Sequence, residues 1–251
     1  MNAEIKTISL DERRVYKVLV GTMFCGENEF VDMRLSVLKQ KNVEIHHQIV
    51  TFLPELQAHQ QLYSYWEENK RKFDLFVQID ADMVLKSENA VSEAANLLMN
   101  SVERGNNSIV CLLHDWYMND LIQGIRFSHP SVKYLCPQNN LFPDRNLDNI
   151  STLVVTGGEP LNPIGTHSEN PTLIQAFRYG LHRGMKGYSS HTQKILTENE
   201  KKFDVRRELA LIGFSFGEKN KDKNSSYSDP FFMESYMQAI GEINKRRVVR
   251  L

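Results

Sequence analysis

An alternation of strand and helix signals over the first 113 residues restricts the possible folds more than any other feature. Short β-branched and aliphatic runs are separated by longer stretches with helical periodicity. The runs lie at residues 14–21, 44–51, 74–80 and 108–113, and the helical stretches at 27–40, 54–72 and 87–103. Because parallel strands need such crossover helices, the pattern predicts right-handed βαβ units and a mostly parallel central sheet. We therefore expect an α/β fold that binds its ligand beyond the carboxyl ends of the strands.

The second half of the chain has a different texture. Residues 115–163 form short strand-like pieces and Asn- and Pro-rich loops, typical of substrate-specific insertions. Helical periodicity resumes at Pro171, with Asn170 as the expected N-cap, and a polar segment at 217–230 precedes a last helix at 230–247. We predict a main domain at residues 1–190 and a C-terminal helical extension at 191–251.

Charge and cysteine content exclude several classes of protein. Thirty Lys and Arg residues balance 31 acidic residues, so the net charge of -1 provides no overall field for nucleic acid or an anionic membrane. The three cysteines form no Cys-x-x-Cys pair, which argues against a disulfide framework and a thiolate zinc site. The polar first fourteen residues and the absence of a long apolar run lead us to expect a cytoplasmic protein that binds no nucleic acid.

The triplet Asp80-Ala81-Asp82 is the strongest chemical signal. It directly follows the apolar run 75–79 and is the only Asp-x-Asp in the chain. Two carboxylates two residues apart at the end of a strand can converge on one hard cation, Mn2+ or Mg2+. Such a cation would bridge the phosphates of a nucleotide and neutralise a diphosphate leaving group. An isolated triplet of this kind is more often a pair of solvated acids, so the preceding strand is what gives it weight.

These features resemble the GT-A fold glycosyltransferases. The resemblance consists of a first strand at 15–21, an intervening βα unit and a strand ending in Asp-Ala-Asp-Met-Val-Leu; it is good for residues 15–113, partial to 186 and absent thereafter. It implies a single GT-A-like, Rossmann-like domain and metal-dependent transfer from a nucleotide-diphosphate sugar to a glycan, lipid-linked or other acceptor. It also implies that Asp82 is the direct metal ligand and that Asp80 faces the ribose or a metal-bound water.

Further site residues follow from the same resemblance. His167 matches, in chain order, the histidine that many GT-A enzymes supply as another metal ligand; the alternative is a structural histidine. Thr22, Glu27 and Asn28 follow the first strand, where the family binds the nucleotide base and ribose.

A basic helix face is a second candidate for anion binding. Arg178 recurs at helical spacing with His182, Arg183 and Lys186, so this face could meet the diphosphate or an anionic acceptor. Solvated surface charge is the alternative reading.

The catalytic base of an inverting reaction would be a carboxylate. Asp115, Asp144 and Glu159 lie between the metal turn and His167, and chain order in related inverting enzymes favours Asp144 or Glu159. The Glu-Asp pair of the family is missing here, and each acid could instead be a loop cap. The neighbouring Trp116 and Tyr117 could form a sugar platform or belong to the core.

The last helix carries an apolar stripe followed by basic residues. The stripe comprises Phe231, Phe232, Tyr236, Ala239, Ile240 and Ile243. It predicts packing against the domain or homodimerisation, with weak peripheral contact to the inner membrane face as the alternative.

Two other functions remain open from the sequence. A sugar-phosphate nucleotidyltransferase would use the same sheet and a metal, but that family expects a glycine-rich loop with a basic residue after the first strand, where this chain has Thr-Met-Phe-Cys. A non-catalytic nucleotide- or sugar-binding module is the third possibility.

Overall fold

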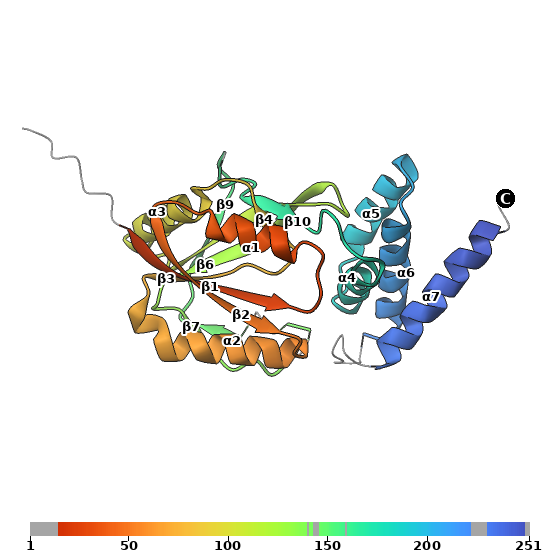
Figure 1. Ribbon diagram of the computed structural model, residues 1–251, viewed down its shortest axis with the longest axis horizontal. Helices are drawn as coiled ribbons and strands as arrows, with labels where there is room; N and C mark the ends of the chain where they lie inside the picture. The colour runs from red at the N-terminus through yellow and green to blue at the C-terminus, as the bar shows by residue number, and fades with distance from the viewer. Residues whose placement is uncertain (1–14, 140, 143–145, 159, 222–229, 249–251) are drawn as a thin grey trace, which may run out of the picture.

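The computed structural model describes residues 15–139, 141–142, 146–158, 160–221 and 230–248. Its centre is a sheet with the strand order β2-β1-β3-β6-β5-β10-β4, in which β9 also pairs with β5 (Figure 1). The strands of this sheet are β1 (Tyr16–Phe24), β2 (Val43–Thr51), β3 (Leu75–Gln78), β4 (Met83–Leu85), β5 (Ser108–Asp115), β6 (Asp120–Ser128), β9 (Thr152–Val155) and β10 (Gly165–His167). A separate small ladder joins β7 (Lys133–Tyr134) to β8 (Leu147–Asp148).

Parallel pairings predominate in the central sheet, which confirms the predicted α/β class. Strand β1 pairs in parallel with β2 and β3, and β5 pairs in parallel with β9 and β10. The antiparallel pairings join β6 to β3 and β5, and β10 to β4. The strands β4, β6 and β10, which bring the antiparallel pairings, all follow the Asp80-Ala81-Asp82 turn, and of these only β6 belongs to the 115–163 insertion.

Helices cover both faces of the sheet. On one face, α1 (Phe30–Leu38) and α3 (Ala90–Val102) pack against alternate residues of the central strands, including Val18, Val20 and Val77. On the other face, α2 (Glu55–Asn69) and β7 enclose Leu19 and Phe76. The 3₁₀ turn η1 (Lys70–Lys72) ends this helix before β3. Because neighbouring residues of one strand point to opposite faces, a continuous apolar run such as that of β1 is buried from both sides.

A second layer of helices lies beyond the carboxyl ends of β1 and β2 (Figure 1). It comprises α4 (Leu173–Met185), α5 (Ser189–Lys201), α6 (Val205–Lys219) and α7 (Pro230–Val248). These helices share one apolar cluster, which also contains Tyr117, Met118 and Leu141 from the insertion. The packing therefore groups α4 with the later helices, while the division of the chain at residue 190 stays a prediction.

The beginning of α4 differs from the sequence expectation. Thr172, and not Asn170, is the N-cap, and the helix starts at Leu173. The Thr172 hydroxyl accepts a hydrogen bond from the Gln175 backbone, and the Gln175 side chain accepts one from the Thr172 backbone. This reciprocal capping box releases Asn170 to hydrogen-bond with the start of α1 instead.

Candidate active site

The turn after β3 presents both predicted metal acids. The Asp80 carbonyl accepts a hydrogen bond from the Met83 backbone at 3.0 Å, which closes a tight turn around the buried Ala81. The Asp80 carboxylate accepts a hydrogen bond from the Gln78 amide at 2.9 Å, and Tyr63 donates to that amide oxygen. Both acids stay partly exposed at the carboxyl end of a buried strand, as predicted.

Sheet register brings His167 to this turn. Strand β10 lies between β4 and β5 and places His167 opposite Met83 on one side and opposite Asp115 on the other. Residues from three distant parts of the chain therefore meet through backbone pairing alone. The next residue, Ser168, donates its backbone N–H to the Asp82 carbonyl at 2.9 Å and its hydroxyl to the Asp82 carboxylate at 2.6 Å.

The His167 imidazole lies between two carboxylates. Its Nδ1 atom is 2.8 Å from Asp115 Oδ2, and its Nε2 atom is 3.4 Å from Asp82 Oδ2. Burial on its own lowers the pKa of His167, but the charge of Asp82 and the hydrogen bond and charge of Asp115 outweigh it and raise the pKa to about 9. Without a metal the ring is therefore protonated at neutral pH and donates toward both acids.

Asp115 is not placed to act as the catalytic base, which corrects one prediction from the sequence. Its side chain is fully buried. Oδ1 accepts a hydrogen bond from the Met118 backbone at 2.9 Å, and Oδ2 accepts from the His167 ring and from the Tyr179 hydroxyl at 3.2 Å. Burial tends to raise the pKa of Asp115, but these hydrogen bonds and the His167 charge lower it overall. Asp115 therefore stays ionised and orients His167.

These residues fit a divalent cation of the oxygen-preferring type only in part. A carboxylate that holds Nδ1 of a histidine while Nε2 faces a second acid is the usual support for a histidine metal ligand. Within the part of the chain that the structure describes, however, no three His, Cys, Asp or Glu side chains converge closely enough to hold a metal on their own. A cation held by Asp82 and His167, with Asp80 nearby, would thus keep open coordination positions, as Mg2+ does in sites that substrate phosphates complete.

The residues predicted to bind the nucleotide differ in their placement. The Thr22 side chain is fully buried, donates to the Ile79 carbonyl at 2.7 Å and contacts His47 Nε2 at 2.9 Å. It therefore stabilises the backbone just before Asp80 and does not face a ligand. Asn28 is exposed and donates to the Asn170 carbonyl at 3.1 Å. Glu27 accepts from the Cys25 backbone; burial, followed by the charge of Asp82, raises the pKa of Glu27.

Arg178 lies close to this acidic region. Its charge lowers the pKa of both Cys25 and Glu27 in the loop after β1. Arg178 is partly exposed, and among the described residues it makes neither a salt bridge nor a side-chain hydrogen bond.

The rest of the predicted basic face is used within the protein. Burial lowers the pKa of His182 well below its usual value, and the ring contacts the Leu141 carbonyl. Arg183 lies over the rings of Tyr179 and Tyr188, and Lys186 lies over Phe142. His182, Arg183 and Lys186 therefore do not form one uniform cationic face with Arg178, because Tyr179 lies one helical turn before Arg183 and Phe142 comes from a distant part of the chain.

Trp116 and Tyr117 pack inside the protein and do not form an open platform for a sugar. Tyr117 is fully buried and stacks on Tyr179 at 4.0 Å between ring centroids. The guanidinium groups of Arg206 and Arg207 lie over the Trp116 ring at 4.5 and 4.2 Å. Both rings thus connect the site to α4 and α6.

Two site residues were missed by the sequence analysis. Phe52, at the end of β2, has a left-handed backbone with φ of 53° and is 71% exposed, and its ring meets Phe24 edge to face at 5.2 Å. Glu29, the N-cap of α1, is buried, and Asp82 contributes to raising the pKa of its carboxyl after burial itself. An isolated Phe or Glu next to a loop gives no sequence signal, because both are common on protein surfaces.

The remaining predictions concern the base and the membrane. Asp144 and Glu159 lie outside the described residues. None of the described helices is both long and apolar enough to span a bilayer. On α7, Phe232, Ala239 and Ile243 are buried in the helical cluster, so this stripe packs against the protein itself.

A distant similarity to a solved structure is found, whereas neither a protein-family model nor a curated protein sequence matches the chain. A mannosyltransferase from Pyrobaculum calidifontis, in complex with GDP-Man and Mn2+, is similar with a TM-score of 0.39 and 8% sequence identity, over 90% of this chain and 75% of that one. A similarity at this level supports no statement about function, so the proposal below rests on the geometry of the site.

Proposed function

We propose that this chain is a glycosyltransferase that uses a divalent cation, Mn2+ or Mg2+, and a nucleotide-diphosphate sugar. The observation that carries the proposal is the placement of His167 between Asp82 and the buried Asp115 at the carboxyl edge of the sheet. A buried carboxylate is costly unless it is paired, and Asp115 is paired with the His167 ring. This pairing orients the imidazole toward the Asp80-Ala81-Asp82 turn.

Charge at the site suits a diphosphate held by a cation. Glu27, Asp80 and Asp82 supply negative charge, and Arg178 is a nearby cation that makes no salt bridge with another described residue. A diphosphate alone would be repelled by the acids, whereas a diphosphate with its cation would be attracted by the acids and by Arg178.

The reaction exchanges one carbon–oxygen bond for another. The acceptor hydroxyl oxygen attacks the anomeric carbon, the bond from that carbon to the diphosphate breaks, and the hydroxyl proton leaves to a base or to solvent. A bound cation would neutralise the charge on the leaving diphosphate. Asp144 and Glu159 remain the proposed bases if the enzyme inverts the anomeric centre.

The aromatic residues at the ends of β1 and β2 supply a surface for the nucleotide base. Phe24 stacks on Phe30 at 4.1 Å between ring centroids, and the exposed Phe52 meets Phe24 edge to face. A strained backbone that exposes a large apolar side chain is characteristic of ligand sites. We infer that Phe52 packs against the base of the donor nucleotide.

An isosteric substitution tests the proposal. Asp82→Asn keeps the size of the side chain and removes its charge, so we expect loss of Mn2+ binding in calorimetry and loss of Mn2+-dependent sugar transfer or donor hydrolysis across a panel of UDP- and GDP-sugars. The matched control is Asp32→Asn, because Asp32 is an exposed acid on α1 and its loss changes the net charge equally. Unchanged metal binding and activity in Asp82→Asn would reject the proposal.

Product analysis separates this function from the alternatives. A sugar-phosphate nucleotidyltransferase would release pyrophosphate from a nucleoside triphosphate and a sugar phosphate. A binding module would bind the nucleotide sugar without forming any product. The free Arg178 and the metal turn are compatible with either, so the identity of the product decides.

A further inference from the structure

One buried carboxylate oxygen of Glu29 has no hydrogen-bond partner among the described residues, although the Gln175 side chain also hydrogen-bonds to this carboxylate. The residue is 4% exposed, and Oε1 accepts a hydrogen bond from the Asn170 backbone at 2.8 Å. Oε2 is also buried and has no hydrogen-bond partner among the described residues. Leaving a charged acceptor buried and unpaired is costly, which points to a ligand or ion that completes it.

The position of Glu29 connects it to the metal turn. Asp82 is held by Ser168 and Glu29 by Asn170, two residues further along the same segment. Ser168 adopts a left-handed backbone with φ of 54°, a conformation that a non-glycine residue keeps only when its surroundings enforce it. The segment after β10 therefore holds both carboxylates, Asp82 through Ser168 and Glu29 through Asn170.

A second unsatisfied atom lies in the same region. The hydroxyl of the fully buried Tyr117 has no hydrogen-bond partner among the described residues, and the charges of Asp82, Asp115 and Glu29 all act on it. Several negative charges thus act on one buried region, and the Arg206 guanidinium interacts electrostatically with Tyr117 and Glu29 there. Such a region attracts a cation.

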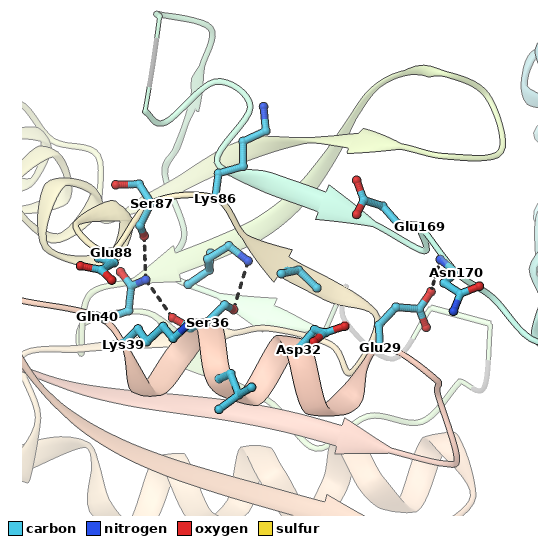
Figure 2. Close-up of a pocket in the computed structure, with 13 residues that line it drawn as sticks. Glu29, Asp32, Ser36, Lys39, Gln40, Lys86, Ser87, Glu88, Glu169 and Asn170 are labelled. Carbon is cyan, nitrogen blue, oxygen red and sulfur yellow. Dashed lines mark hydrogen bonds between the residues drawn. The ribbon is translucent and has the colours of Figure 1, made fainter.

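Glu29 also borders open space. It lies at one end of a groove of about 480 Å³ between α1 and β4, next to Asn170 and Glu169, while Lys39, Gln40 and Glu88 lie at the other end (Figure 2). Asp80, Asp82 and His167 do not line this groove. Glu29 thus lines the groove and also feels the charge of Asp82 in the turn after β3.

We propose that Glu29 is a further acid of the cation site, whose buried carboxylate attracts the divalent cation held by Asp82 and His167. The inference rests on the cation of the proposed function. Since no three acidic or histidine side chains of the described chain converge at ligand spacing, Glu29 acts through its charge over a longer range than direct ligation. Its contribution is affinity for the cation before a nucleotide arrives.

The test is Mn2+ titration of the full chain without nucleotide, by calorimetry and by electron paramagnetic resonance of free Mn2+. Glu29→Gln keeps the acceptor for the Asn170 backbone and removes the charge, so we expect the Kd for Mn2+ to rise about tenfold or more, the range found when supporting groups of a metal site are removed. The control is Glu169→Gln, which removes an exposed acid from the same groove and should leave the Kd within about twofold.

Thermal unfolding without metal distinguishes a cation site from a structural acid. Removing an unpaired buried charge should leave the melting temperature of Glu29→Gln equal to or above that of the wild type. A lower melting temperature together with an unchanged Kd would overturn the inference and make Glu29 a purely structural cap. If Glu29→Gln does not fold, Glu29→Asp, which keeps the charge, should retain a Kd within about threefold of the wild type; a larger loss would equally overturn the role of charge.

The result also separates this inference from the proposed function. Loss of Mn2+ binding in Asp82→Asn with normal binding in Glu29→Gln would reject only the role of Glu29. Absence of Mn2+ binding by the wild type, with and without nucleotide sugar, would reject both.

Discussion

The contact between α4 and α6 allows a prediction of stability to be worked out from the structure. Gly180 and Gly184 of α4 face Gly213 and Gly217 of α6, at a spacing of four residues in each helix. A Cβ added at Gly180 would lie 1.7 Å from the carbonyl oxygen of Ala210. At each of the other three glycines it would lie 2.2 Å from a backbone carbonyl oxygen of the opposite helix. The two backbones therefore approach as closely as glycine permits.

The substitution Gly180→Ala should destabilise the protein. The new methyl group cannot be accommodated by a side-chain movement, because the obstructing atoms belong to the α6 backbone. Forced repacking of this kind costs about 2–3 kcal/mol, the upper part of the usual range because the obstructing atoms are backbone, and the better helix propensity of alanine returns about 1 kcal/mol. We expect a net loss of about 1–2 kcal/mol, which for a chain of this size lowers the melting temperature by roughly 2–8 °C.

A matched glycine provides the control. Gly241 lies within α7, and a Cβ added there meets no atom within 4 Å. Gly241→Ala should therefore stabilise the protein by about 0.5–1 kcal/mol through helix propensity alone. Urea unfolding of both variants measures the difference. If Gly180→Ala is as stable as Gly241→Ala, the close approach of α4 and α6 is refuted.

Two further predictions concern pH and the nucleotide. Burial, followed by the charge of Arg34, lowers the pKa of His47 to about 4. In the unfolded chain this histidine takes up a proton below about pH 6.5. The contribution of neutral His47 to the free energy of unfolding is therefore fully present above pH 6.5 and is lost as the pH drops from 6.5 to 4. Urea unfolding at pH 7.5 and 4.5 measures how much stability each protein loses on acidification. His47→Gln should lose roughly 1–2 kcal/mol less than the wild type, after allowance for partial exposure of the ring. An equal loss in the wild type and the variant would contradict the prediction. Phe52→Ala should weaken nucleotide binding by about 1–3 kcal/mol in calorimetry, as loss of base stacking does, but change stability by less than about 0.5 kcal/mol. The control is Leu38→Ala, which removes an exposed apolar side chain at the end of α1. Equal nucleotide affinity in the two variants would count against a stacking role.

Local sequence patterns predicted the parallel half of the sheet and the turn at Asp80-Ala81-Asp82, because both depend on neighbouring residues; that this turn binds a metal stays a prediction. The apolar run before Asp80 identifies a buried strand, and its end identifies the turn. The position of His167 depends instead on β10, a strand of three residues whose partners are β4 and β5. A strand this short has no detectable periodicity, so the chain order of a resemblance was the only guide to it.

Other residues were misjudged because their surroundings come from distant segments. Asp115 follows the predicted strand at 108–113, and loop acids near a strand end are ordinarily accessible. In the structure β5 continues to Asp115, and Tyr179 and His167 then enclose its carboxylate. The glycines of α4 and α6 lower helix propensity in each helix taken alone, and their purpose is visible only when the two helices are placed together.

The C-terminal helices contact residues of the candidate site. The buried Arg207 of α6 donates from Nη2 to the Trp116 carbonyl at 2.7 Å and from Nε to the Tyr117 carbonyl at 3.1 Å. That turn positions the Met118 N–H on Asp115, and Tyr179 of α4 binds the other oxygen of the same carboxylate. Because Asp115 fixes the ring of His167, the orientation of the imidazole depends on how α4 and α6 pack. A separation of these helices should therefore weaken Mn2+ binding as well as stability, and Gly180→Ala can reveal it through a metal affinity lower than that of Gly241→Ala.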